Sequence, residues 1–284
     1  MQNKQATSFM EATGVIQYNM TNDYMFRYIL QKNKKVLKGL ICSLLHLQPE
    51  QIKNVEITNP IDLSEEINGK DFILDIDVLL NDNTQINLEM QVENKHNWPD
   101  RSLAYLCRSF DQLYRGQEYE EALPVIHIGF LDYTLFPDVP EFYAKNMLMN
   151  VKNHWIYNDK FTLSVVDLSR IELATEEDKA YHIDYWARLF KAKTWEDIKM
   201  LAEKNEYLQE AAQSVYMANA EEIVRQKCRA REDAERHERT MKRDMNRLKK
   251  ENATVKKENA AMKQENAAMA TRIAELEPQL AQKK

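Results

Sequence analysis

Acidic and amide side chains alternate with apolar ones along residues 70–95, KDFILDIDVLLNDNTQINLEMQVENK. Asp75 and Asp77 fall on the polar face of one predicted strand, and Glu89 and Gln91 fall on the polar face of the next. Carboxylates gathered on one sheet face repel each other unless protons or a divalent cation reduce the repulsion. Oxygen ligands with no nearby His or Cys favour magnesium or manganese over zinc. This spacing indicates a cation site, and the alternative is a hairpin whose polar row faces water.

Two strands joined by a polar turn must position these side chains. Bringing their apolar rows together requires a register in which one of the two aspartates lies opposite Glu89 or Gln91. The turn is then either residues 82–84 or a five-residue loop that begins at Leu80, since Asn and Asp tolerate left-handed geometry. The apolar rows are Phe72, Leu74, Ile76, Val78 and Leu80 in the first strand and Ile86, Leu88, Met90 and Val92 in the second.

A helix is predicted after the second strand, over residues 97–114. Arg101, Arg108 and Arg115 recur at i, i+7 and i+14, which places them on one face of that helix. Arginine forks match phosphate oxygens, so this face is a candidate phosphate-binding surface. The alternative is a solvated face with intramolecular ion pairs. The predicted buried stripe of the same helix is Leu103, Leu106, Phe110, Leu113 and Tyr114.

Composition limits the classes of function. The chain of 284 residues has room for one or two domains. Its 39 Lys and Arg against 45 Asp and Glu give a net charge of −6, so nucleic acid must be bound through a local patch if at all. Three widely spaced cysteines argue for a reducing compartment and against a disulfide framework. With no signal peptide or membrane-spanning run, we expect a soluble cytoplasmic protein.

The remaining elements predict a helix-rich α/β fold. Residues 1–20 are predicted to be a flexible leader, and a helix begins at Thr21 with Asp23 in its first turn, where a carboxylate stabilises the positive helix end. The run 123–131 is almost wholly apolar, as in a strand buried on both faces, so its His127 is interpreted as a hydrogen-bonded core residue. Further predictions are helix 36–45, strands 55–57, 147–151 and 161–168, and amphipathic helices over 176–220.

A heptad repeat occupies residues 245–280. The units ENATVKK, ENAAMKQ and ENAAMAT follow each other without a gap from Glu251. Apolar residues fill one core position and asparagines much of the other, which predicts a coiled coil. Asn252, Asn259 and Asn266 pair best in a two-stranded, parallel, in-register coil. We therefore expect a parallel homodimer, with a coil that binds another protein as the alternative.

Five short segments, in this order, carry a resemblance to a known family. They are TNDYMFR at 21–27, LDI at 74–76, NLEMQ at 87–91, RSLAY at 101–105 and PVIHI at 124–128. With this order and spacing the chain resembles the recombination-promoting nuclease (Rpn), or putative transposase, family of the PD-(D/E)XK nuclease superfamily, over roughly residues 20–220.

The resemblance implies a restriction-endonuclease-like mixed sheet flanked by helices. In that superfamily an Asp and a Glu bind the catalytic magnesium. Here they correspond to Asp75 and Glu89, with the carbonyl of Met90 completing the shell. Gln91 stands where the superfamily has Lys, so it can orient water or a phosphate oxygen but supplies no positive charge. Asp23 matches the place of an acid on the first helix of many members.

The predicted function is that of a metal-dependent DNA endonuclease, in recombination, mobile-element movement or defence. Mg²⁺ or Mn²⁺ is the expected cofactor, and DNA is the expected partner, held at its phosphates by Arg101, Arg108 and Arg115 without sequence reading. The alternative is an inactive nuclease-like protein that works in assembly through its coil. The expected organisation is a leader at 1–20, a nuclease-like domain at 21–175, a helical extension at 176–220, and a long charged helix with the coiled coil at 221–284.

Overall fold

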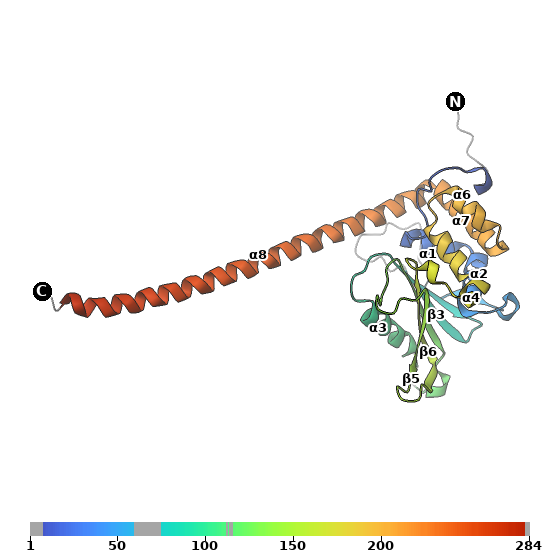
Figure 1. The fold of residues 1–284 in the computed structure, drawn as a ribbon. Coiled ribbons are helices and arrows are strands. Elements are labelled where there is room, and N and C mark those ends of the chain that lie inside the picture. Colours follow the sequence, from blue (N-terminus) through green and yellow to red (C-terminus); the bar gives the residue numbers. More distant parts are fainter. Residues whose placement is uncertain (1–7, 60–74, 112, 114–115, 282–284) are drawn as a thin grey trace, which may run out of the picture. The chain divides into compact units, whose positions relative to one another are not determined.

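A computed structural model describes residues 8–59, 75–111, 113 and 116–281 (Figure 1). Its strands are β1 Val55–Ile57, β2 Ile76–Leu80, β3 Thr84–Gln91, β4 Val125–Leu131, β5 Tyr143–Met149 and β6 Ile156–Asp167. Its α-helices are α1 Asp23–Lys32, α2 Lys34–Leu45, α3 Trp98–Phe110, α4 Glu176–Ala180, α5 Ile183–Lys191, α6 Trp195–Ala202, α7 Glu206–Ala220 and α8 Glu222–Ala281. Short 3-10 helices are η1 Phe9–Glu11, η2 Pro49–Gln51, η3 Tyr119–Glu121 and η4 Ile171–Leu173.

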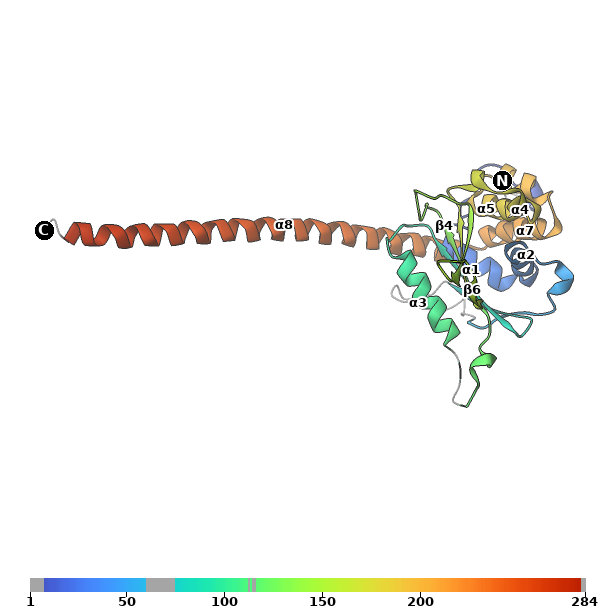
Figure 2. The same cartoon turned by 60° about the horizontal axis from the view of Figure 1, so that its bottom comes forward.

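The strands form a six-stranded mixed sheet in the order β1-β2-β3-β4-β6-β5. The central strands β3, β4 and β6 run parallel, whereas β1, β2 and β5 pair antiparallel with their neighbours. The connection from β3 to β4 places α3 on one face of the sheet, and α1, α2, α5 and α7 lie on the other (Figures 1 and 2). A parallel centre covered on both faces confirms the predicted α/β class.

The β2–β3 hairpin has one of the two predicted registers. Ile76 pairs with Leu88 and Asp77 with Asn87, so the next position along both strands brings Asp75 level with Glu89. The apolar row faces the main core, where every member within β2 and β3 is buried: Ile76, Val78, Leu80, Ile86, Leu88 and Met90. The predicted positions Phe72 and Leu74 lie outside the described residues.

The hairpin turn is the predicted five-residue loop closed by one additional pair. Leu80 pairs with Thr84, so residues 81–83 make the turn. Asn81 and Asp82 take positive φ angles of 52° and 60° there. Asn and Asp adopt such backbone geometry more readily than other non-glycine residues, as the sequence predicted.

Residues 8–20 contradict the predicted flexible leader. The Ile16 N–H donates to the Lys193 carbonyl, and the Gly14 carbonyl accepts from the Trp195 N–H, so this segment is bound to the start of α6. The segment is held on the domain because four of its apolar side chains are buried in the core: Phe9, Ile16, Tyr18 and Met20. Residues 1–7 lie outside the described part of the chain.

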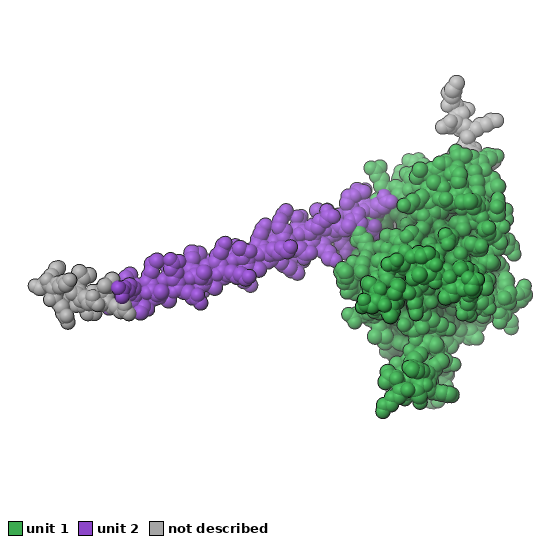
Figure 3. Space-filling model, viewed as in Figure 1, with its two compact units in different colours: residues 1–231 green, residues 232–284 purple. Residues whose placement is uncertain are grey.

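The chain divides into two compact units, Met1–Arg231 and Glu232–Lys284 (Figure 3). The helices α4 to α7, predicted as an extension, belong to the first unit, and α7 packs on α1 and α2. The long charged helix is present as α8, a continuous helix of 60 residues. Its described heptad residues are solvent-exposed: Met245, Leu248, Val255, Met262, Met269 and Ile273. A search of the described residues finds no helix long and apolar enough to cross a membrane.

Candidate functional site

The polar face of the β2–β3 hairpin is buried beneath α3. Asn87, Glu89 and Gln91 are all inaccessible to solvent or nearly so. Gly129 of β4 lies level with Glu89, and the fully buried indole of Trp98 occupies the space that a side chain at Gly129 would need. This close approach lets the first turn of α3 cover the carboxylate. The alternative in which the polar row of β3 faces water is therefore wrong.

Arg101, one helical turn after Trp98, reaches Glu89. Its Nη2 lies 2.7 Å from Glu89 Oε1. Its guanidinium also lies over the ring of Tyr105, 5.2 Å from the ring centre, where a cation is attracted to the π face. Glu89 Oε2 has no hydrogen-bond partner among the described residues. Burial raises the pKa of Glu89 to about 7, with Arg101 opposing the increase and Asp75 adding to it.

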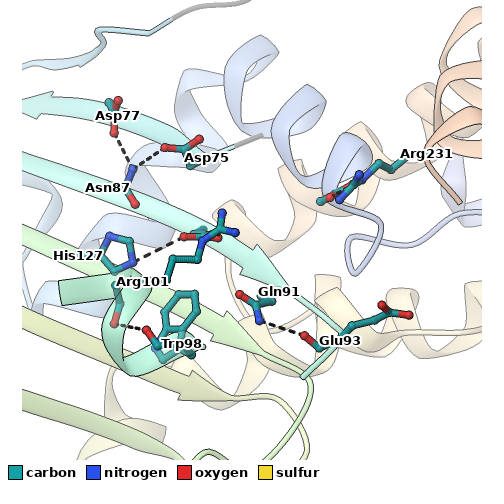
Figure 4. A network of polar contacts seen from close by, with 12 residues as sticks. Asp75, Asp77, Asn87, Gln91, Glu93, Trp98, Arg101, His127 and Arg231 are labelled. Atoms are coloured by element: carbon teal, nitrogen blue, oxygen red, sulfur yellow. Dashed lines mark hydrogen bonds and ion pairs between the residues drawn. The ribbon is translucent and has the colours of Figure 1, made fainter. Parts of the chain in front are cut away.

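A histidine approaches the same carboxylate from β4. His127 pairs with Asn87 in the β3–β4 register, and its Nε2 lies 3.8 Å from Glu89 Oε2 (Figure 4). Its ring is fully buried against Trp98, with ring centres 5.5 Å apart. Burial lowers the pKa of His127 to about 4, so the imidazole is neutral at pH 7.

Two sequence-based expectations about His127 are wrong. Neither ring nitrogen has a hydrogen-bond partner within the described part of the chain, so it is not a hydrogen-bonded core residue. The second expectation was that no histidine lies near the carboxylates, whereas His127 lies close to Glu89. The signal for this was the pattern of 125–131: alternation puts His127 and Gly129 on one face of the strand, and that face meets Glu89 once β4 pairs in parallel with β3.

Asp75 and Asp77 are joined through Asn87. The Asn87 side-chain amide donates to Asp75 Oδ2 at 3.0 Å and to Asp77 Oδ1 at 2.6 Å (Figure 4). Burial raises the pKa of Asp77, against the Asn87 hydrogen bond. A pocket of about 200 Å³ opens beside Asp77 and Asn87, and Ser109 of α3 lines its far wall. The open space thus adjoins Asp77 and Asn87, whereas neither Asp75 nor Glu89 lines this pocket.

Arg27 of α1 holds the start of β2. Its guanidinium donates to the backbone carbonyls of Asp75 and Asn59. The Asn59 side chain donates to the Asp75 carbonyl at 3.2 Å and accepts from the Asp77 N–H at 2.9 Å. Arg27 is fully buried, and burial lowers its pKa against the attraction of Asp75 and Asp77. Sequence reasoning missed it, although an arginine within the apolar run 24–30 was a signal.

Gln91 is fixed by two hydrogen bonds. Its side-chain nitrogen donates to the Tyr133 hydroxyl at 2.9 Å and to the Glu93 carbonyl at 3.0 Å. Its Oε1 is buried and has no partner among the residues described. Met90 points its side chain into the core on the opposite face, so only its backbone can serve the site. Tyr133, which orients Gln91, was not singled out from the sequence.

The arginine face of α3 is shorter than predicted. Arg108 is exposed, and its guanidinium lies 5.7 Å from the Tyr105 ring centre, so Arg101 and Arg108 share that ring. The helix ends at Phe110, because Asp111 leaves helical geometry and its carboxylate is unfavourable at the negative helix end. Arg115 therefore follows the helix, and it lies outside the described residues. Leu103, predicted to be buried, is exposed.

Asp23 is not brought to the acidic cluster. It is the first residue of α1, and its two carboxylate oxygens accept from Arg231 Nε at 2.9 Å and 2.6 Å. Figure 4 shows Arg231 well apart from Asp75, Asp77 and Asn87. Burial raises the pKa of Asp23, and Arg231 opposes the increase. The position suits a structural ion pair between α1 and the start of α8.

The cluster fits a sparsely ligated divalent cation. Glu89 Oε2 is buried without a hydrogen bond, and Asp75 lies level with it on the neighbouring strand. No three His, Cys, Asp or Glu side chains converge on one point within the described ranges. Magnesium suits this donor set, because it commonly keeps several waters and needs one or two carboxylates. The described residues do not offer the four protein ligands that a structural zinc site usually has.

The family follows from a comparison of the whole chain with known families. The model of the PD-(D/E)XK nuclease family transposase matches residues 20–245. The chain belongs to this family. The match spans α1, the complete sheet and α3, and so includes Arg27, Asp75, Glu89 and Arg101. Comparisons with curated proteins and with solved structures found no match.

Proposed function

We propose that this member of the PD-(D/E)XK nuclease transposase family is a metal-dependent DNA endonuclease that hydrolyses phosphodiester bonds. The observation that carries the proposal is the placement of Asp75 and Glu89 at one level of neighbouring strands, with a buried oxygen of Glu89 left unbonded. Cys42, Cys107 and Cys228 form no disulfide among the described residues, which suits the proposed reducing cytoplasm. Recombination, mobile-element movement or defence are the expected settings.

Asp75 and Glu89, with the Met90 carbonyl, would hold Mg²⁺ or Mn²⁺. The bound ion would lower the pKa of a water and neutralise charge on the scissile phosphate. Arg27 keeps Asp75 in place through its backbone carbonyl. The pKa of Glu89, about 7, means that it loses its proton readily at mildly alkaline pH and then offers both oxygens.

Gln91 would orient the attacking water. Its nitrogen is already committed to Tyr133 and Glu93, so the unbonded Oε1 is the atom that accepts a hydrogen bond from that water. A carboxamide supplies no positive charge, so compensation of the phosphate charge must come from other groups.

Arg101 and Arg108 are the cations that could neutralise the charge of the phosphate. Arg108 is exposed and ready to contact a phosphate. Arg101 pairs with Glu89 in this structure, and its guanidinium would be available to the DNA backbone where a cation took its place at Glu89. Phosphate contacts of this kind position DNA without reading its sequence.

The heptads of α8 would join two copies of the chain. Their apolar residues are exposed, and a second identical helix covers them in a parallel coil in which Asn252, Asn259 and Asn266 face their counterparts. Glu251 with Lys256 and Glu258 with Lys263 would bridge the two helices. A dimer carries two candidate sites, one for each strand of a duplex.

A non-catalytic assembly role is the second candidate. Two observations favour it: Gln91 replaces the expected lysine, and Arg101 already satisfies one oxygen of Glu89. A protein of this kind would keep the nuclease-like fold and use α8 to recruit a partner. Metal binding does not separate the two candidates, whereas cleavage does.

Supercoiled plasmid tests the proposal. Purified protein is incubated with plasmid and Mg²⁺ or Mn²⁺, beside Glu89→Ala and the exposed control Glu56→Ala. Nicking or linearisation by wild type and control, lost in Glu89→Ala, supports a nuclease with Glu89 in its site. No cleavage by folded protein under any condition supports the assembly role instead.

A further inference from the structure

The far end of the β5–β6 hairpin, residues 145–160, exposes an unusual number of apolar side chains. We call this segment the hairpin tip. It lies at the bottom of the first unit in Figure 1, and the space-filling view in Figure 3 shows a lobe there. Trp155 and Tyr157 are 76% and 81% exposed. The other large exposed side chains are Leu148, Met149, Val151 and Ile156.

The tip is an ordered turn. The Asn150 N–H donates to the Trp155 carbonyl at 2.8 Å, and the His154 N–H donates back to the Asn150 carbonyl at 2.8 Å. The Asn153 side chain accepts from the Trp155 N–H at 3.0 Å. The backbone that carries Trp155 is therefore fixed, and its ring is presented to solvent without a covering element among the described residues.

The charge of the tip is opposite to that of the chain. Residues 145–160 contain three lysines and one acid, Asp159, which is +3 − 1 = +2 against −6 for the whole protein. Lys160 is committed to the carbonyls of Glu120 and Ala122. Lys145 and Lys152 contact no carboxylate within the described part of the chain. Two free ammonium groups thus accompany the exposed rings.

We propose that the hairpin tip binds DNA, with Trp155 and Tyr157 stacking on bases and Lys145 and Lys152 contacting phosphates. Trp155 and Tyr157 lie two residues apart at the exposed end of the hairpin, where the pairing of β5 with β6 is irregular. Aromatic rings stack on bases of any sequence, and a two-stranded ribbon fits the major groove. The asparagines of the tip hold its backbone: the side-chain oxygens of Asn150, Asn153 and Asn158 accept from backbone N–H groups, and Asn146 donates to the Leu163 carbonyl.

The distance to the acidic cluster suits a single duplex. Glu89, Gly129 and Val165 lie at one level of the sheet. Ala144 of β5 pairs with Val165 and Met149 pairs with Ile156, so five residues of β5 span the stretch, which is about 17 Å along a strand. About five base pairs of a duplex cover that length at about 3.4 Å each. The inference rests on the proposed function, because it supplies that site with a second contact on the same DNA.

The fluorescence of Trp155 can be used to detect its contact with DNA. The chain has four tryptophans, and Trp98, Trp186 and Trp195 are buried, so acrylamide quenches mainly Trp155. Duplex and single-stranded oligonucleotides are added in EDTA, which prevents cleavage, and acrylamide quenching and fluorescence anisotropy of labelled DNA are both recorded. We expect DNA to protect Trp155, added salt to reverse the protection, and Trp155→Ala to weaken binding about 5-fold or more.

Two variants complete the comparison. Trp155→Phe keeps a stacking ring and binds DNA nearly as well as the wild type, but it loses the quenchable emission. Phe136→Ala removes another exposed aromatic ring outside the tip and leaves the affinity unchanged. Both positions are exposed, so the substitutions leave the core intact.

The outcomes separate this inference from the proposed function. DNA binding with no change in Trp155 quenching, and equal affinity of Trp155→Ala, overturns the role of the tip and leaves the nuclease proposal standing. Absence of any DNA binding overturns both. Protection of Trp155 that increases with protein concentration without DNA shows that a second copy covers the tip, and this result also overturns the inference.

Discussion

Glu89→Gln should stabilise the fold at pH 8 and change its stability little at pH 4. Burial raises the pKa of Glu89 from 4.5 to about 7. The folded protein therefore holds this proton more tightly than the unfolded chain does. Below pH 4.5 both states are protonated and no penalty exists. Between pH 4.5 and about 7 the unfolded chain releases this proton while the folded protein keeps it, so the free energy of unfolding falls, and above about 7 the loss is complete.

The size of the effect follows from the same two values. The difference between 4.5 and about 7 corresponds to about 3 kcal/mol, at about 1.4 kcal/mol for each tenfold change in proton affinity. Glutamine keeps the shape of the side chain and never ionises. The value of about 7 already includes the attraction of Arg101 for the charged carboxylate, so the loss of this ion pair is not subtracted again. The expected net gain at pH 8 is about 3 kcal/mol.

Urea unfolding followed by circular dichroism, between pH 4 and pH 8 in EDTA, measures the difference. Subtracting the two proteins at each pH cancels the titrating groups that lie far from Glu89, and His127, whose pKa burial lowers to about 4, is neutral over most of this range. Glu56→Gln, an exposed carboxylate on β1, is the control and should stay within about 0.5 kcal/mol of wild type throughout. A Glu89→Gln variant that is less stable at pH 8, or that differs equally at pH 4 and pH 8, would refute the reasoning.

Further predictions concern the supports of the site and the long helix. Arg27→Met should lower the unfolding free energy by about 3 kcal/mol, because buried carbonyl groups lose their donors, whereas Arg27→Lys should lose less; thermal unfolding checks both. Gly129→Ala should lower it by about 1–3 kcal/mol, because the new methyl group overlaps the Trp98 ring; urea unfolding measures this, and wild-type stability would contradict the packing. Removal of residues 245–284 should halve the mass in light scattering; an unchanged mass argues against the coil dimer. Mg²⁺ should raise the melting temperature of the wild type at pH 8 but not that of Glu89→Gln; equal shifts would argue against Glu89 as a ligand.

Alternation along the β2–β3 segment was sufficient to predict the hairpin. With a period of two, the apolar row fixes the face and leaves two registers, so the sequence alone places one of the two aspartates opposite Glu89 or Gln91. The covering of the polar face could not be predicted in this way. It depends on Trp98 entering the space above Gly129, and these residues belong to two segments whose separation in space no local pattern reveals.

The supporting residues were missed for related reasons. Arg27 bonds to backbone carbonyls, which every residue has, so no side-chain pattern identifies its partners. His127 was interpreted as core from its apolar neighbours alone, and only the parallel pairing of β4 with β3 shows that it faces Glu89. The leader was expected to be flexible, yet residues 8–20 are bound to the start of α6 by tertiary contacts, which no local pattern reveals.

Rates of plasmid cleavage for wild type, Asp75→Asn, Glu89→Gln and the double variant test the central claim most directly. If both carboxylates hold one cation, each single variant should lose cleavage, and the double variant should lose no more than either single one. All variants should retain DNA binding in EDTA. Wild-type cleavage by either single variant, or losses that multiply in the double variant, would contradict a shared cation site.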